Sequence, residues 1–317
     1  MKDCFLSHAF KAQSQAKECG TDDPGQVEKL KSKEERLTGI ARKLQDSCFK
    51  SKIVSEMIEY MYDNKFCDNL DSKPHLLAFT NGVWDLSTSC FRQAKSEDLL
   101  SLSVRYDYVD GRDEERRQCV IDYWKSLHPD QDQREYVIKT FSRQLFGDNG
   151  LDLFHIHSGS QGTASNGKTK CFEVLEACLG GYVRKFGVEF SIASQRPDPG
   201  KPMPEFQNWK GRRILYCTEP NHSDTLNSGI MKDLTGGENI LYRILFLNKT
   251  HEFRPQYKMH IMCNDTPKVD GSDKGVQRRI RKIDYISQFV DAALVNEEQH
   301  LYRRNNSIFS AFRGDPL

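Results

Sequence analysis

The fold is decided by residues 151–170, which read LDLFHIHSGSQGTASNGKTK. They begin with an apolar run, pass through a loop of small residues, and end where a helix is expected to start. Inside them, GTASNGKT at 162–169 fits the phosphate-loop pattern G-x-x-x-x-G-K-[ST]. Glycines let backbone N–H groups approach phosphate oxygens, and the helix adds the positive end of its dipole. The stretch therefore predicts a nucleotide site.

Each position of this loop has an expected part in the site. Lys168 can reach the β- and γ-phosphates, and the Thr169 hydroxyl can bind Mg²⁺. The alternative is a surface loop of small residues that happens to precede a lysine, and the strand–loop–helix context favours the nucleotide. The expected binding residues are Gly162, Thr163, Ala164, Ser165, Asn166, Gly167, Lys168, Thr169 and Lys170.

Composition limits the rest of the chain. Its 317 residues suggest two domains, and 46 Lys and Arg against 45 Asp and Glu mean that any contact with nucleic acid is local. Ten cysteines without a C-x-x-C pair argue against a zinc site and fit a reducing compartment. No secretory leader and no apolar run near the roughly 18 residues of a membrane helix are found. We expect a soluble intracellular protein without a membrane partner.

The first half predicts a polar arm followed by a small α+β domain. Residues 1–36 lack apolar periodicity and read as a solvated helix or partly disordered arm. Residues 37–150 contain helical spacing at 37–62, a hairpin around Asn81-Gly82 at 75–91, a strand at 103–109, and amphipathic helices at 114–127 and 132–146. Gly147 to Gly150 then break the pattern. We place the boundary of the last domain, residues 151–317, there.

The second half alternates strands and helices, which predicts an α/β fold. Residues 213–219, RILYCTE, form an apolar run that ends in Glu219. On a parallel strand beside the phosphate loop, Glu219 would face the γ-phosphate, polarise the attacking water and help to hold Mg²⁺. The alternative is a buried strand with a capping glutamate. Residues 257–264 are a second strand, whose terminal Asn264 suits a sensor of the γ-phosphate.

Two basic segments allow both a functional and a plain reading. Residues 244–255 predict a hairpin whose tip exposes Lys249 and His251, and an ordinary solvated turn would look the same. Residues 274–282, KGVQRRIRK, carry five cations and no acid. They are either a solvated basic face or the source of an arginine that reaches a neighbouring subunit's nucleotide.

The order of these segments resembles that of the superfamily 3 helicases, a branch of the AAA+ ATPases, and specifically the poxvirus-type primase-helicases of large DNA viruses and some phages. The likeness covers roughly residues 75 to 290. Its motifs are LAFTNGVWDLST before the helicase, GTASNGKT as Walker A, RRILYCTEPN as Walker B, MKDLTGGENILYR as the motif peculiar to superfamily 3, KMHIMCNDTP as motif C, and GVQRRIRKIDYISQF around the arginine finger.

This resemblance implies an AAA+ P-loop ATPase core with a central, mostly parallel sheet, preceded by a smaller α+β domain. It implies ATP and Mg²⁺ as ligands, with Thr169 and Glu219 at the metal. In its catalytic set, Lys168 binds phosphate, Glu219 activates water, Asn264 positions that water or senses the γ-phosphate, and Arg278 or Arg279 completes the next subunit's site.

The resemblance also implies partners. A homo-oligomeric ring, on the family pattern a hexamer, would move single-stranded DNA with a pore hairpin after the Gly-Gly turn. Lys249 and His251 occupy that place, and Lys232 matches a family lysine in the preceding motif. A primase and other replication proteins are further expected partners, at a cytoplasmic viral replication site or in the nucleus.

Some features depart from the pattern and keep alternatives open. Thr218 precedes Glu219, so Walker B offers one clear acid, and Glu238 and Gln277 replace the family's usual Asp and aromatic residue. The chain ends at Leu317, so the helical lid is expected to be short or missing. A non-enzymatic ATP-binding module for ring assembly or loading is one alternative, and a P-loop small-molecule kinase is another.

Overall fold

The computed structural model describes residues 2–18, 24–111, 113–148, 150–159, 165–192, 203–218, 220, 224–244, 250–269 and 273–305. Two compact units make up the chain, Met1–Phe66 and Cys67–Leu317. No helix within those described ranges is long and apolar enough to cross a membrane. The division predicted at residues 36 and 150 stays a prediction.

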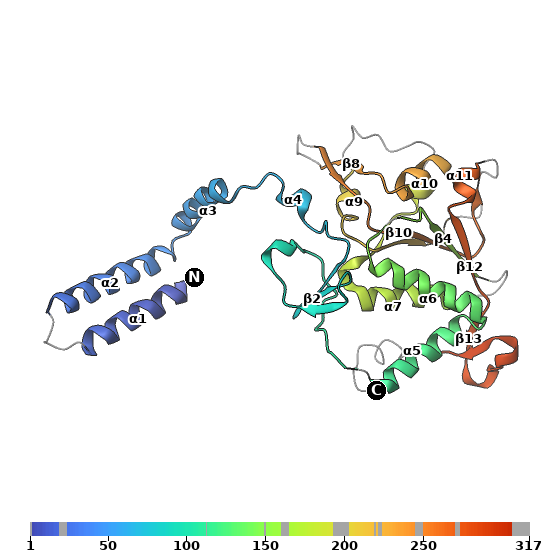
Figure 1. Cartoon of the computed structure of the whole chain (residues 1–317), viewed down its shortest axis with the longest axis horizontal. Helices are drawn as coiled ribbons and strands as arrows, with labels where there is room; N and C mark the ends of the chain where they lie inside the picture. Colours follow the sequence, from blue (N-terminus) through green and yellow to red (C-terminus); the bar gives the residue numbers. More distant parts are fainter. Residues whose placement is uncertain are drawn as a thin grey trace. The chain divides into compact units, whose positions relative to one another are not determined.

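The first unit is helical. Its helices are α1 (Lys2–Glu18), α2 (Pro24–Lys43) and α3 (Ser47–Met61), so the described part of the predicted polar arm is helical. Helices α1 and α2 lie side by side (Figure 1), and Ala9, Ala12 and Ala41 are buried. Their small side chains allow the close approach. Helix α3 begins after Asp46, whose carboxylate accepts the Cys48 N–H at 2.9 Å, and each of its residues is at least partly exposed.

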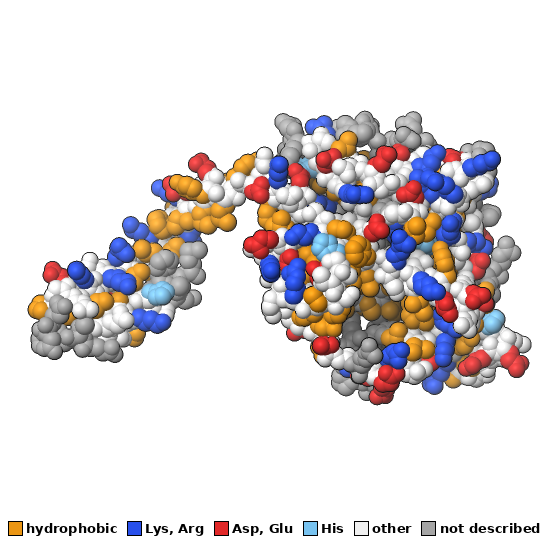
Figure 2. All heavy atoms as spheres, in the orientation of Figure 1, with side chains coloured by type: hydrophobic (Ala, Val, Ile, Leu, Met, Phe, Trp, Pro, Cys, Tyr) orange, Lys and Arg blue, Asp and Glu red, His pale blue; other side chains and the backbone are white. Residues whose placement is uncertain are grey.

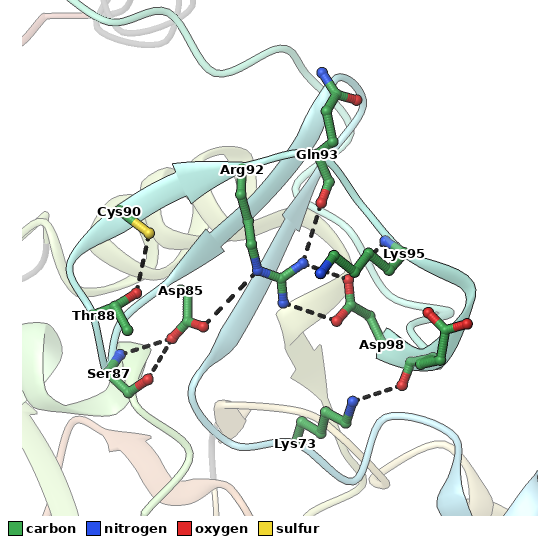
Figure 3. A network of polar contacts seen from close by, with 10 residues as sticks. Lys73, Asp85, Ser87, Thr88, Cys90, Arg92, Gln93, Lys95 and Asp98 are labelled. Atoms are coloured by element: carbon green, nitrogen blue, oxygen red, sulfur yellow. Dashed lines mark hydrogen bonds and ion pairs between the residues drawn. The ribbon is translucent and has the colours of Figure 1, made fainter.

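The second unit starts at Cys67, within α4 (Phe66–Asn69), and continues into the predicted hairpin. Strands β1 (Leu76–Phe79), β2 (Gly82–Asp85) and β3 (Cys90–Arg92) form an antiparallel sheet. The Arg92 guanidinium donates two 2.8 Å hydrogen bonds to the Asp98 carboxylate in η1 (Ser96–Asp98), which fixes the chain as it leaves β3 (Figure 3). The sequence prediction of the hairpin is confirmed.

The prediction of a strand over residues 103–109 is wrong. These residues are all described and form no strand, although the Val104 N–H donates to Ala78 at 3.0 Å and the Thr80 N–H to Tyr106 at 3.1 Å. The reason lies between those two bonds. Arg105 has a φ of 71°, in the left-handed region, which turns the backbone out of an extended ladder.

The two predicted amphipathic helices are confirmed. They are α5 (Glu114–Leu127) and α6 (Gln131–Leu145), and each begins with an aspartate that accepts a backbone N–H, Asp113 from Arg116 and Asp130 from Gln133. Leu127, Val137 and Phe141 are buried, whereas the charged residues of both helices face outward. These helices bring the segment before residue 150 against the sheet that follows it.

A five-stranded parallel sheet forms the centre of the second unit. Its strands, in spatial order, are β12 (Ile280–Tyr285), β4 (Phe154–Gly159), β10 (Lys258–Cys263), β6 (Ile214–Thr218) and β5 (Val183–Lys185). All neighbouring pairs are parallel, so the carboxyl ends of the strands share one edge. The predicted α/β fold with a central parallel sheet is confirmed.

Apolar cores cover both faces of the sheet, because alternate residues of its strands point to opposite sides. In β6, Ile214 and Tyr216 join the core that contains α6 and α7 (Lys168–Leu179), and Leu215 and Cys217 join the other. The second core includes the fully buried Trp209. Around this second core lie α8 (Glu189–Ile192), α9 (Pro204–Gln207), β7 (Thr225–Leu226), α10 (Ser228–Thr235) and β11 (Lys268–Val269), whereas Tyr182 of η2 (Gly180–Tyr182) joins the first core.

The remaining elements include a hairpin that packs into the second core through Ile240, Tyr242 and Phe253. Strands β8 (Ile240–Arg243) and β9 (Thr250–Phe253) form the antiparallel hairpin predicted after the Gly-Gly turn. Helix α11 (Lys274–Gln277) precedes β12. The segment after β12 contains β13 (Gln288–Val290), η3 (Ala292–Leu294), η4 (Glu297–Gln299) and β14 (Leu301–Arg303).

Candidate functional site

The end of the predicted phosphate loop lies at the carboxyl edge of the sheet. Gly167 caps the amino end of α7 with a φ of 81°, a conformation that glycine adopts without strain. A Cβ atom at this position would lie 2.7 Å from Leu127 Cδ1 and 2.7 Å from Phe289 Cε2. Both the backbone and the packing therefore require glycine, and the turn aims the first N–H groups of α7 toward the sheet edge.

Two residues predicted to act on the same phosphate lie together. Lys168 Nζ, at the start of α7, donates a 3.1 Å hydrogen bond to Asn264 Oδ1, directly after β10. Strands β4 and β10 are neighbours, which brings the loop after one strand next to the residue after the other. A Cβ on Gly159 would lie 2.5 Å from Lys168 Nζ, so a glycine at the end of β4 gives the ammonium its place. Partial burial lowers the pKa of the Lys168 ammonium.

Residues after β12 brace the loop from behind. The Phe289 N–H donates to the Ser165 carbonyl at 3.0 Å, and the buried Asn166 donates its side-chain N–H to the Ser287 carbonyl at 3.0 Å. Sequence reasoning missed Ser287 and Phe289, because their contacts with the loop depend on chain folding over more than 120 residues. The sequence offered no local signal for these contacts, because Phe289 lies in a segment with several other apolar residues.

Part of the predicted set lies outside the described residues: Gly162, Thr163, Ala164, Lys249 and Glu219. Glu219 follows Thr218, the last residue of β6, which pairs in register with Met262 of β10. Strand β10 therefore lies between β4 and β6. Strands β4 and β6 end at the same edge of the sheet, and the prediction that Glu219 faces the γ-phosphate stays a prediction.

Thr169 and Lys170, the two residues directly after Lys168, are exposed. Thr169 lies in the first turn of α7 with its side chain open to solvent, as a ligand of phosphate-bound Mg²⁺ would need. Lys170 Nζ lies 2.7 Å from the Glu173 carboxylate on the outer face of the same helix. The predicted roles of both residues in nucleotide binding stay predictions.

The two candidate finger arginines have different surroundings. The Arg279 side chain is 13 % exposed, and its guanidinium donates to the Gly275 carbonyl and to Asp152, both at 3.3 Å. The Arg278 side chain is 68 % exposed and lies 3.7 Å from Asp152. Arg279 thus holds the segment in place, whereas Arg278 extends outward. Lys and Arg side chains gather on the surface over α10 and α11 (Figure 2).

The residues predicted to bind DNA are placed differently from expectation. His251 is not at an exposed hairpin tip: it lies within β9, its side chain is 11 % exposed, and its ring stacks on Tyr242 at 5.5 Å. Period-2 alternation in β9 turns this residue inward toward Asp68, 3.9 Å away. Lys232 Nζ on α10 donates a 2.7 Å hydrogen bond to Asp273. Contact of either residue with DNA stays a prediction.

A buried polar chain beneath the site was not foreseen. His157 on β4 hydrogen-bonds Tyr285 at 3.0 Å and His260 on β10 at 2.8 Å, and His260 hydrogen-bonds Gln144 on α6 at 3.1 Å. Burial lowers the pKa of His157 and of His260 well below the usual value. The alternation H-I-H in β4 was visible in the sequence, but it did not identify the partners.

Comparison with known proteins gives the chain its relatives. Residues 11–147 match the family described as D5 N terminal like. "Putative helicase L207/L206" of Acanthamoeba polyphaga mimivirus is 32% identical over 255 residues, which is 80% of this chain and 26% of that protein. "Putative helicase 022R" of Frog virus 3 (isolate Goorha) is 24% identical over 319 residues, with coverage of 80% and 32%. "Putative primase C962R" of African swine fever virus (isolate Warthog/Namibia/Wart80/1980) is 25% identical over 243 residues, with coverage of 75% and 25%.

The chain thus spans about a quarter to a third of the length of these relatives. Among solved structures, the NrS-1 C terminal region in its A form is similar with a TM-score of 0.45 and 14% identity, over 68% of this chain and 48% of that one.

Proposed function

Because the chain fits the D5-like primase-helicase family of large DNA viruses, we propose that it is the ATP-hydrolysing part of a superfamily 3 DNA helicase, with an AAA+ core. The observation that supports this most is the 3.1 Å contact between Lys168 and Asn264 at the carboxyl edge of a parallel sheet. In open α/β sheets this edge is where ligands bind. A lysine at a helix start and an amide after the adjacent strand are the groups that a triphosphate requires there.

The chain's own residues would then divide the work of hydrolysis. The amino end of α7 and the Lys168 ammonium attract phosphate oxygens, since both present positive charge at one point. Thr169 and Glu219 would hold Mg²⁺, which neutralises charge on the β- and γ-phosphates when bound. Glu219 would also orient and polarise the attacking water, and Asn264 would position Lys168 or that water.

Arg278 is the better candidate for the trans arginine. It is 68 % exposed at the surface, whereas Arg279 is committed to Gly275 and Asp152 within its own chain. An arginine supplied by a neighbouring subunit can raise phosphoryl transfer by about 10³–10⁵-fold. We therefore propose a ring, by family pattern a hexamer, in which each site is shared between two protomers.

Single-stranded DNA is the proposed cargo, and the β8–β9 hairpin is the proposed element that grips it. The hairpin follows α10 and carries Lys249 between its strands. Few cations are available, so binding should rest on phosphate contacts and weaken with salt. Relatives named as helicases and primases make a primase and other replication proteins the proposed further partners.

Subunit mixing tests this function directly. Lys168→Ala and Arg278→Ala should each abolish most ATP turnover, and a mixture of the two should recover part of it. Mixed rings contain interfaces with one intact lysine and one intact arginine. Arg281→Ala is the matched control, because Arg281 is an exposed arginine on the same segment. Turnover should rise more than linearly with protein concentration and be stimulated by single-stranded DNA.

Two outcomes would contradict the proposal. Turnover that survives Lys168→Ala would remove the site from α7. Nucleotide-dependent assembly without any turnover in the unchanged chain would instead support a ring-assembly or loading module.

A further inference from the structure

Lys232 and Asp273 join two elements that lie far apart in the sequence. Lys232 Nζ in the last turn of α10 donates to Asp273 Oδ2 at 2.7 Å. The other carboxylate oxygen, Asp273 Oδ1, accepts the N–H groups of Gly275 at 2.9 Å and Val276 at 3.2 Å, and so caps α11. One carboxylate therefore both starts α11 and ties it to α10. The hydrogen bond from Lys232 lowers the pKa of Asp273, so the carboxylate stays ionised near neutral pH.

The two helices are packed closely around this pair. A Cβ on Gly275 would lie 3.0 Å from Asp273 Oδ1 and 3.5 Å from Lys232 Cδ. A Cβ on Gly236, directly after α10, would lie 3.8 Å from Arg279 Nη2. The spacings from Lys232 Cδ and Arg279 Nη2 are those of van der Waals contact, so the end of α10 lies against α11 and Arg279. A shift of one helix would therefore be felt by the other.

Each helix leads to an element with a proposed function. Helix α11 is followed directly by Arg278. The next residue, Arg279, binds Asp152 through its guanidinium, and the Arg279 carbonyl accepts the Phe154 N–H at 2.8 Å. Helix α10 is followed by the turn at 236–239 and then by β8 of the hairpin. Three apolar residues of α10, namely Ile230, Met231 and Leu234, are buried in the core, so this helix can act as a rigid body.

We propose that Lys232 and Asp273 form a coupling pair, two positioning residues that link the position of the Arg278 segment to that of the β8–β9 hairpin. This inference rests on the proposed function and goes beyond it. Lys232 acts on DNA through α10 and does not bind phosphate itself. When the arginine segment engages or leaves a neighbour's nucleotide, the pair transmits the displacement to the hairpin.

Removing the charge of Lys232 or of Asp273 distinguishes a coupling role of the pair from direct binding of Lys232 to DNA. The variants are Lys232→Met, Asp273→Asn and the double variant, and asparagine is chosen because it still caps a helix. Lys274→Met is the control, an exposed lysine on the same short helix. The measurement is the ratio of DNA-stimulated to basal ATPase, with affinity for a fluorescent oligo-dT over a range of salt concentrations.

A coupling pair predicts that both single variants lower the stimulation ratio alike, by about 5-fold or more, the lower end of ordinary coupling between sites. The double variant should equal either single variant, and Lys274→Met should leave the ratio unchanged. A direct phosphate contact predicts otherwise: Lys232→Met alone would weaken DNA binding and reduce the salt slope by about 1. That result, or additive effects in the double variant, would overturn the proposal.

Amide hydrogen exchange tests the coupling pair independently of ATP hydrolysis. Asp273→Asn should speed exchange in β8 and β9 as well as in α11, whether or not the chain turns over ATP. Faster exchange confined to residues 274–277 would overturn the coupling pair and leave the proposed function standing. Absence of any DNA-stimulated turnover in the unchanged chain would instead count against the proposed function.

Discussion

Lowering the pH from 7 to 5 should remove most of the stability of the second unit. Four histidines in it are almost completely buried: His128, His155, His157 and His260. Burial lowers the pKa of His128 to about 4 and of His155 to about 4, and lowers the pKa of the other two well below 6.5. These histidines stay neutral in the folded chain while they become protonated in the unfolded chain.

The sign and the size of this loss of stability follow from proton linkage. Between about pH 4 and 6.5 the unfolded state binds more protons, so the free energy of unfolding falls as the pH falls. At pH 5 each buried neutral histidine lowers the free energy of unfolding by about 2 kcal/mol relative to pH 7, and four of them lower it by about 7 kcal/mol. The typical free energy of unfolding is about 5–15 kcal/mol. Carboxylates do not offset this. The guanidinium of Arg92 lowers the pKa of Asp98 to about 2, and such acids lose their contribution only below about pH 4.

Urea unfolding at pH 5 to 7.5 measures this slope. The three tryptophans, Trp84, Trp124 and Trp209, all lie in the second unit, so their fluorescence reports on it alone. In His155→Leu the slope should fall by about one proton, and the variant should be up to about 2 kcal/mol more stable than the unchanged chain at pH 5. His8→Leu, at an exposed position of α1, is the control. A midpoint that does not move between pH 7 and 5 would refute the reasoning.

Two further variants test how the site is held. Gly167→Ala should lower the free energy of unfolding by about 2–5 kcal/mol, because alanine is strained in the left-handed backbone conformation and overpacks against Leu127 and Phe289. The variant should also lose binding of a fluorescent ATP analogue. An unchanged urea midpoint would contradict this prediction. Arg213→Met should cost at least about 3 kcal/mol, because several buried carbonyls lose their donor; a loss no larger than that of the exposed Arg143→Met would contradict it.

The sequence predicted those parts of the molecule whose structure depends on local pattern. The Asn81-Gly82 turn, the periodic helices α5 and α6, and the start of a helix at Lys168 could be predicted because their causes lie within a few residues. The sequence predicted that Lys168 and Asn264 act on the same phosphate. It did not predict that the two side chains touch, which follows from the order of the strands in the sheet. What local pattern could not give was long-range placement.

The failures show this limit. Residues 103–109 have strand-like composition, yet the left-handed Arg105 interrupts them. His251 lies in a basic stretch that looks exposed, but the alternation of β9 turns it toward Asp68 and Tyr242. The place of β10 between β4 and β6 was not predicted at all, because it follows from a crossover that no window of sequence contains.

The amino edge of the sheet is built as a fixed base. Arg213, just before β6, is buried and donates to the carbonyls of Pro74, Leu76 and Leu145 at 3.1, 3.2 and 3.2 Å, and it also contacts Gln256. Its own carbonyl accepts the Lys258 N–H at 3.0 Å, which fixes the start of β10. Residues from within the D5 N terminal like segment, 11–147, are therefore bonded into the base of the central sheet.

This anchoring decides where movement can occur. A buried guanidinium that serves several carbonyls cannot shift without leaving them unsatisfied, so the amino ends of β6 and β10 must move together with the hairpin β1–β3. The carboxyl edge has no comparable clamp among its described residues. There, the single contact of Lys168 with Asn264 joins the start of α7 to the residue after β10. Changes driven by nucleotide should therefore alter the loop before α7 and, through the coupling pair, α10 and α11, and leave the sheet and the segment bonded to its base unchanged.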